Sequence, residues 1–268
     1  MPPLMLLDLD NTLIDRNLAF RGWAAEFLQE RSLPPTDLDW LVTLDCGGHL
    51  DRQTVMRAAS ERYGLAEDID VLLKEYRETL TRLIQCPDSH REALRAARAA
   101  GWTLCIVTNG ATVHQLAKIE QTGLAALVDG WIVSEEAGCA KPDPRIFRLA
   151  AARCGLAVGP GWTEDTWMVG DHAPADIAGA RLAGLRSVWL DHGRPWPETV
   201  YSPTWTARDL PEAVSLILDS VGNPVSNPAG ALGRPDQAAV LRPLVRPPYA
   251  PNTSEGRFSV NFGGLHRD

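Results

Sequence analysis

The spacing of apolar positions changes along the chain near residue 87. Before that point only the run Leu4-Met5-Leu6-Leu7 resembles a short buried strand. Residues from about 15 to 86 instead place apolar side chains three and four positions apart, which is typical of amphipathic helices. Helices are predicted at 19–31, 37–44, 52–63 and 69–84. We therefore expect an all-helical insert after the first strand; the alternative is that these helices form part of the main core.

From residue 87 onward, strand-like and helix-like segments alternate. This rhythm predicts right-handed crossovers and a parallel sheet covered by helices. Glycines follow several of the helical segments, where a helix end favours a left-handed residue. Strands are predicted at 103–107, 130–134, 166–169, 185–190 and near 204–205, and helices at 89–100, 111–122, 144–154, 174–183 and 209–220.

The C-terminal segment, residues 221–268, is rich in proline and glycine and has little periodicity. Such a segment buries too little apolar area to offset the entropy lost on ordering. We predict a mostly disordered tail. Leu241, Leu244 and Val245 leave a docking segment as the alternative.

Composition and charge exclude several classes of protein. The 268 residues are 45% hydrophobic and 22% charged, as in ordinary soluble globular proteins. A net charge of -8 argues against a nucleic-acid partner, which requires a basic face. No apolar run is long enough for a membrane span or a signal peptide, so no membrane partner is expected. The five cysteines form no CxxC pair, which favours a reducing, cytoplasmic location.

Two carboxylates, Asp8 and Asp10, follow the first predicted strand directly. The carboxyl ends of parallel strands are where ligand sites form in open α/β sheets. Acidic groups two residues apart at such an edge can share a cation and a substrate, one as nucleophile and one as proton carrier. Taken alone, the pair is equally compatible with a simple turn at the end of a strand.

Three later segments place polar side chains in the same relation to strands and helices. They are Thr108-Asn109-Gly110 after a strand, Lys141-Pro142-Asp143 before a helix, and Gly170-Asp171 after a strand with Asp176 following. With Asp8 and Asp10, these segments resemble the four motifs of the haloacid dehalogenase (HAD) superfamily, in order and over roughly residues 4–220. The resemblance implies an α/β fold: a Rossmann-like parallel sheet core, a helical cap inserted after the first strand, and the Pro/Gly-rich C-terminal tail.

The resemblance also implies roles for individual residues. Asp8 matches the nucleophile that forms an aspartyl-phosphate, and Asp10 matches the acid and base of the reaction. Lys141 matches the lysine that bridges the nucleophile and the phosphate. Thr108 matches the hydroxyl donor to the phosphate, with the amide of Asn109 nearby.

A magnesium site follows from the same match. Asp8 and Asp171 correspond to side-chain ligands of Mg²⁺, and the backbone carbonyl of Asp10 to a third ligand. Asp176 is expected to contact these ligands rather than the ion. Position 11 is Asn where glycine is common in the family; Asn tolerates positive φ well, so the turn is expected to persist.

The resemblance divides the chain into a core, residues 1–14 and 87–220, and a small helical cap of the C1 type, residues 15–86. Within the cap, the loop from Asp45 to Arg52 contains a pair of glycines. His49 and Arg52 are candidate substrate contacts there; an ordinary helix–helix turn is the alternative. His172, beside a predicted metal ligand, is interpreted as an ordinary residue before a helix.

The acid at position 10 favours phosphate chemistry over dehalogenation, because a departing halide needs no proton. The prediction is a Mg²⁺-dependent phosphatase acting on a small-molecule phosphate ester. A phosphomutase and a non-catalytic binding protein remain alternatives. The residues specify neither the substrate nor the oligomeric state.

Overall fold

The computed structural model describes residues 2–222. The predicted disordered tail and its docking alternative therefore lie outside the described residues, except at the end of the last helix. No helix within the described part of the chain has the length and apolar character needed to cross a membrane.

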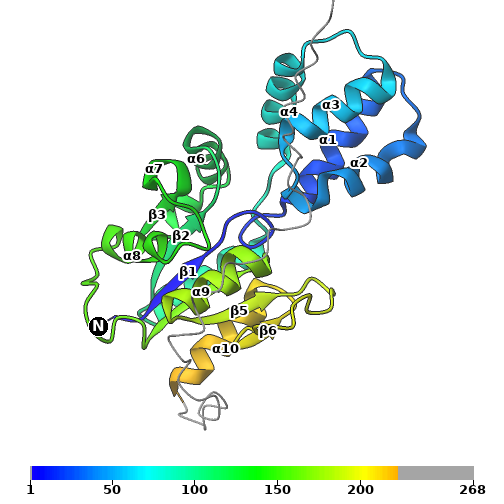
Figure 1. The fold of residues 1–268 in the computed structure, drawn as a ribbon. Coiled ribbons are helices and arrows are strands. Elements are labelled where there is room, and N and C mark those ends of the chain that lie inside the picture. Colours follow the sequence, from blue (N-terminus) through cyan, green and yellow to red (C-terminus); the bar gives the residue numbers. More distant parts are fainter. Residues whose placement is uncertain (1, 223–268) are drawn as a thin grey trace, which may run out of the picture. The chain divides into compact units, whose positions relative to one another are not determined.

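A six-stranded parallel sheet forms the centre of the fold (Figure 1). The strand order is β3-β2-β1-β4-β5-β6. Strands β2 and β3 are added on one side of β1, and β4 to β6 on the other side, so the switch point of the sheet lies between β1 and β4. The six predicted strands are all present: β1 (Leu4–Leu7), β2 (Thr103–Thr108), β3 (Gly130–Val133), β4 (Thr166–Gly170), β5 (Arg186–Leu190) and β6 (Trp205–Ala207).

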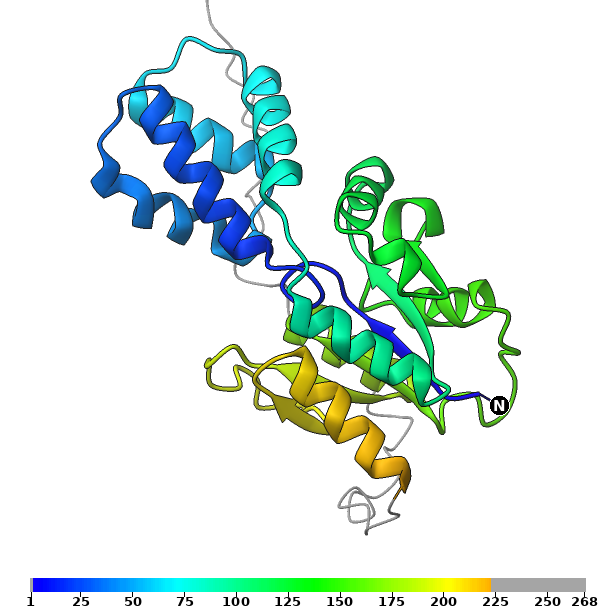
Figure 2. The same ribbon diagram turned by 180° about the vertical axis from the view of Figure 1, so that it is seen from behind.

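Alternating strand residues point to opposite faces of the sheet. Leu4 and Leu6 pack with α8 (Pro144–Arg153) and α9 (Ala178–Ala183), whereas Met5 and Leu7 belong to the apolar cluster on the other face. That second face is covered by α5 (Asp88–Ala99) and α10 (Leu210–Gly222), which lie side by side in Figure 2. Both faces are apolar because both are covered, as in other parallel sheets.

Three short features complete this part of the chain. Helix α6 (Thr112–Gln121) joins β2 to β3, as predicted. A short helix, α7 (Ser134–Ala137), follows β3 and was not expected from the sequence. The predicted helix at 174–183 begins as a π-helical turn, Ala173–Ile177, and continues as α9.

Four helices separate β1 from β2, where the sequence predicted a helical insert. They are α1 (Arg16–Glu30), α2 (Leu38–Asp45), α3 (Arg52–Tyr63) and α4 (Ile69–Leu83). Helix α1 packs against α2 and α4, and α3 packs against α4. Aspartates cap three of these helices: Asp15 accepts a hydrogen bond from Leu18 N at 2.9 Å, Asp51 from Thr54 N at 3.1 Å and Asp68 from Asp70 N at 2.8 Å.

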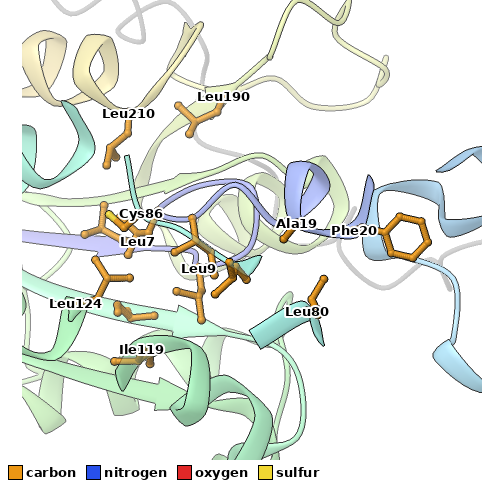
Figure 3. Packing of buried hydrophobic residues seen from close by; sticks show 14 of the residues in the cluster. Leu7, Leu9, Ala19, Phe20, Leu80, Cys86, Ile119, Leu124, Leu190 and Leu210 are labelled. Carbon is orange, nitrogen blue, oxygen red and sulfur yellow. The ribbon is translucent and has the colours of Figure 1, made fainter. Parts of the chain in front are cut away.

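The apolar cluster on the α5 face of the sheet continues into these four helices. Figure 3 shows Leu7 and Leu9 beside Ile119 of α6, and Phe20 of α1 and Leu80 of α4 farther along the same cluster. Beyond Phe20, the rings of Trp23 and Tyr76 meet edge to face, with centroids 5.0 Å apart. Apolar packing therefore supports the segments that leave the sheet after β1 and return before α5.

Gly179 offers a test of the packing between α8 and α9. A Cβ at this position would lie 2.8 Å from Phe147 Cζ and 3.0 Å from Pro142 Cα, closer than packed atoms tolerate. We predict that Gly179→Ala lowers the free energy of unfolding by about 1–3 kcal/mol, because the neighbours must shift. Urea denaturation followed by circular dichroism measures this change.

Gly159→Ala is the matched control, since a Cβ there meets no atom within 4 Å. This control is expected to leave stability unchanged or slightly raised, because alanine restricts the unfolded chain. Equal stability of the two variants would contradict the packing argument.

Candidate active site

Asp8 lies directly after β1, at the switch point of the sheet. Its backbone N donates to Val169 O at 3.0 Å, which extends the pairing of β1 with β4 and aims the side chain at the carboxyl edge. The carboxylate is nearly buried and accepts a hydrogen bond on Oδ1 from Lys141 Nζ at 2.6 Å. Asp8 Oδ2 accepts no hydrogen bond from residues 2–222.

The position of Lys141 is fixed by Asn109 at the end of β2. The Asn109 amide donates to Lys141 O and its Oδ1 accepts from Lys141 N, both at 2.9 Å. Both polar groups of the Asn109 side chain are thus engaged by the backbone of the lysine. This pairing joins two of the four segments identified in the sequence and gives Asn109 a structural contact that the sequence did not predict.

A third carboxylate, Asp171, follows β4, and a fourth, Asp176, lies in the π-helical turn. Asp176 is fully buried; its Oδ2 accepts from His172 N at 3.0 Å and its Oδ1 lies 2.7 Å from Lys141 Nζ. One oxygen from each of Asp8, Asp171 and Asp176 lies within 4.8 Å of the others. Carboxylate oxygens so close together are the donor set that a hard divalent cation prefers.

Negative charge exceeds positive charge at this edge, and the pKa values of Asp8, Asp171 and Lys141 are shifted accordingly. Burial, only partly offset by Lys141, raises the pKa of Asp8 to about 7. Burial and the neighbouring charges of Asp8 and Asp176 raise the pKa of Asp171 to about 8. Burial opposes the charge on Lys141, but Asp176 and Asp8 outweigh it and raise the lysine pKa. The three acids therefore hold more negative charge than Lys141 alone can compensate, which fits a cation site.

Asp10 faces α6 instead of the other carboxylates. Lys118 Nζ lies 2.6 and 2.8 Å from its two oxygens, and Gln115 Nε2 donates to Oδ2 at 3.2 Å. Gln115 Nε2 also lies 2.5 Å from Thr108 Oγ1, so one amide links two predicted site residues. Burial alone would raise the pKa of Asp10, but Lys118 and Gln115 hold it below its usual value.

Lys118 and Gln115 were not predicted from the sequence. The sequence shows only that both are polar and lie three residues apart in a helical segment; the structure adds that both are buried. Residues with this spacing share one helix face, so their burial together indicates a polar partner.

The turn after Asp10 is formed by Asn11 with φ of 60°, as expected for Asn in place of glycine. Its side chain joins two parts of the structure. Asn11 Oδ1 accepts from Asn17 N in α1 at 2.9 Å, and Nδ2 donates to Gly47 O at 3.3 Å. A glycine could make neither contact, so this departure from the family pattern gains a structural role.

A cavity of about 430 Å³ opens over these carboxylates. Eight of the residues predicted to form the site line it: Asp8, Asp10, His49, Arg52, Thr108, Asn109, Lys141 and Asp171. Asp176 lies behind this surface, fully buried. The structure thus brings the predicted residues together, whereas their individual roles stay predictions.

His172 also lines the cavity, contrary to its interpretation as an ordinary residue. Its ring stacks on that of His49, with centroids 3.9 Å apart and planes 19° from parallel. Burial, followed by the neighbouring His172, lowers the pKa of His49 to about 4. Burial also lowers the pKa of His172, so both rings favour the neutral form, which is compatible with stacking. The sequence gives no signal for a contact between positions so far apart.

Arg52 lines the cavity but is not free. It forms an ion pair with Asp45, which is 2% exposed, and also donates to Leu50 O. Arg16 pairs with the same carboxylate and donates to Tyr76 Oη at 2.9 Å. Arg16, at the start of α1, was not predicted as part of the site because an arginine in a first helical turn is ordinarily a surface residue.

The chain matches the haloacid dehalogenase-like hydrolase family over residues 3–184. It is similar to a phosphoserine phosphatase of Thermus thermophilus, 37% identical over 164 residues, which cover 60% of this chain and 63% of the relative. The pyrimidine 5'-nucleotidase YjjG of Escherichia coli is 41% identical over 113 residues, 42% of this chain and 48% of that protein. Both matches thus span less than two thirds of the relative.

A longer match is to a ribulose-1,5-bisphosphate 5-phosphatase of Halopiger xanaduensis, 32% identical over 213 residues, 71% of this chain and 85% of the relative. Among solved structures, the Bacillus subtilis HAD-hydrolase YfnB, bound to magnesium, is 25% identical with a TM-score of 0.63, covering 81% of this chain and 98% of that chain. The family match, the longer relative and the carboxyl-edge site agree, and the chain belongs to the haloacid dehalogenase-like hydrolase family.

Proposed function

We propose that this hydrolase is a Mg²⁺-dependent phosphatase that removes phosphate from a small-molecule monoester through an aspartyl-phosphate on Asp8. One observation carries the proposal: Asp8 and Asp10, two residues apart, face the same cavity but contact different lysines, Lys141 and Lys118. Separate environments suit one carboxylate to nucleophilic attack and the other to proton transfer. Several relatives are named phosphatases, which supports the choice.

The proposal includes the division of the chain. Residues 1–14 and 87–220 would form the catalytic core, and residues 15–86 the C1-type cap, whose helices supply the side of the cavity opposite the carboxylates. The enzyme would act in the cytoplasm on a small phosphate ester, without nucleic-acid or membrane partners.

In the first step, an oxygen of Asp8 attacks phosphorus while the ester P–O bond breaks and its electron pair leaves with the alcohol oxygen. Lys141, held on Asp8 Oδ1, lowers the repulsion between the carboxylate and the phosphoryl group. Thr108 Oγ1 accepts from Gln115, so the hydroxyl proton remains free to donate to a phosphoryl oxygen. Asp10 in its protonated form gives its proton to the leaving oxygen.

In the second step, Asp10 accepts a proton from water, whose oxygen attacks phosphorus and releases Asp8 and inorganic phosphate. Lys118 favours the ionised form of Asp10 that this step uses; the first step requires the contact with Lys118 to lengthen as the proton arrives. Mg²⁺ held by Asp8, Asp171 and the Asp10 carbonyl would supply the positive charge that keeps the buried acids ionised and stabilises the phosphoryl oxygens.

Asp8→Asn tests the nucleophile. The amide keeps the size of the side chain but is not nucleophilic, so we expect phosphate release to fall at least about 10³-fold with the melting temperature little changed. Asp39→Asn, a change of the same kind at an exposed carboxylate on α2, is expected to retain wild-type activity. Normal turnover by Asp8→Asn would refute the aspartyl-phosphate.

Removal of divalent ions tests the metal. EDTA is expected to abolish wild-type turnover, and added Mg²⁺ is expected to restore it.

Asp10→Asn tests the proton carrier. The variant cannot protonate the leaving oxygen, so turnover should fall most for alkyl phosphates and less for p-nitrophenyl phosphate, whose leaving group hardly needs a proton. Rates across a series of esters of differing alcohol pKa measure this dependence. A uniform loss across the series would assign Asp10 a structural role, and a phosphorylated isomer in place of free phosphate would favour a phosphomutase.

His49→Ala tests recognition by the helical side of the cavity. The variant removes a ring that lines the cavity and stacks on His172. We therefore expect kcat/KM to fall more for the best alkyl phosphate substrate than for p-nitrophenyl phosphate, which makes few contacts beyond the phosphate. Arg52→Ala is the less informative change because it also breaks the ion pair of buried Asp45. Equal losses on both substrates would assign His49 to folding or to chemistry.

A further inference from the structure

The positive charges on the catalytic side of the cavity are all paired. Lys141 lies between Asp8 and Asp176, and Lys118 lies on Asp10. These two cations are therefore occupied by the carboxylates that the chemistry requires.

The helical side of the cavity has a different balance. Arg16 and Arg52 both pair with one carboxylate, Asp45, so two guanidinium charges share a single negative charge. A residual positive charge therefore remains at the base of the four helices, beside the cavity that Arg16 and Arg52 line.

Arg77 adds a further charge to the same side. It lies on α4, lines the cavity, is exposed, and forms no ion pair or side-chain hydrogen bond within residues 2–222. An exposed helical arginine can pair with an acid three or four residues away. The residues at those positions are Leu73, Lys74, Leu80 and Thr81, so helix α4 offers Arg77 no such partner.

The surroundings of Arg77 are suited to an anion. Thr81, one turn later on the same face, and His114, at the start of α6, line the cavity with it, and α4 contacts α6. The hydroxyl and the imidazole N–H are neutral donors that can complete the hydrogen bonding of an anionic group. Burial, then the positive charges of Arg77 and Lys118, lowers the pKa of His114, in keeping with a positive local field.

We propose that Arg77, with Thr81 and His114, binds a second anionic group carried by the leaving portion of the substrate. The natural substrate would then be a phosphomonoester that also bears a carboxylate or a second phosphate. This inference rests on the proposed phosphatase function, because it names the group that the same substrate carries at the end away from the scissile phosphate. A guanidinium favours both anions through paired hydrogen bonds, so the shared chemistry is the negative charge.

The test compares esters that differ only at the end away from the scissile phosphate. Short alkyl phosphates of increasing length carry a terminal hydroxyl, carboxylate or second phosphate, and phosphate release gives kcat/KM for each. For at least one chain length, we expect the wild type to favour an anionic ester over its hydroxyl analogue by about tenfold or more. A larger gain with the carboxylate or with the second phosphate identifies which anion the site takes.

Arg77→Gln is expected to reduce this anionic-to-neutral ratio to within about twofold of unity, and Arg77→Lys to keep part of it. The ratio is a readout that a merely structural role would not move. Arg57→Gln is the matched control: Arg57 is exposed on α3, forms no ion pair within the described residues and does not line the cavity. Arg57→Gln should keep the wild-type ratio. In the wild type, high salt should lower the anionic-to-neutral ratio, because salt screens the attraction between Arg77 and the anion.

Two results would overturn the inference and leave the phosphatase standing: hydrolysis of neutral esters without preference for any anionic one, or a preference that persists in Arg77→Gln. Absence of phosphate release from every ester, p-nitrophenyl phosphate included, would instead refute the proposed function and this inference with it.

Discussion

The contact of buried Lys141 with Asp8 and Asp176 is the interaction on which the rest of the site depends. Parallel pairing of β1 with β4 brings Asp8 and Asp171 to neighbouring strand ends, and the π-helical turn adds Asp176. Unpaired carboxylates buried at such an edge would cost several kcal/mol each. One ammonium group within 2.7 Å of two of them makes the arrangement tolerable.

Holding that lysine in place requires contacts that have no direct chemical task. The side chain of Asn109 binds the backbone of Lys141 on both sides. The next residue, Pro142, is packed against Gly179, whose missing side chain allows α9 to approach. Segments that follow β2 and β4 thus hold the backbone at Lys141 and Pro142. The negative charge that Lys141 leaves uncompensated suits this edge to a divalent cation.

The sequence predicted the strands, the parallel sheet and the helical block well, because each depends on local periodicity. It also singled out Asp8, Asp10, Thr108, Lys141 and Asp171, which follow strands or precede a helix; the structure places all five along one cavity, and their roles stay predictions. It missed Lys118 and Arg16, because a charged residue in a helical segment is expected to lie at the surface. Only the structure shows that their partners, Asp10 and Asp45, lie beside them. The stacking of His49 on His172 joins residues from opposite sides of the cavity, and no local pattern encodes such a contact.

In the proposed function, the two sides of the cavity would have different roles because their charges differ. On the sheet side, Lys141 and Lys118 are paired with Asp8 and Asp10, the proposed catalytic carboxylates, so neither lysine would be left to distinguish one alcohol from another. On the helical side, two arginines share Asp45, and Arg77 has no carboxylate partner within residues 2–222. Asn11 links the two sides, because it forms the turn after Asp10 and contacts both α1 and Gly47. In the proposed function, recognition of the leaving group would therefore fall to the helices, and the Asn11 turn would couple their position to Asp10, the proposed proton donor.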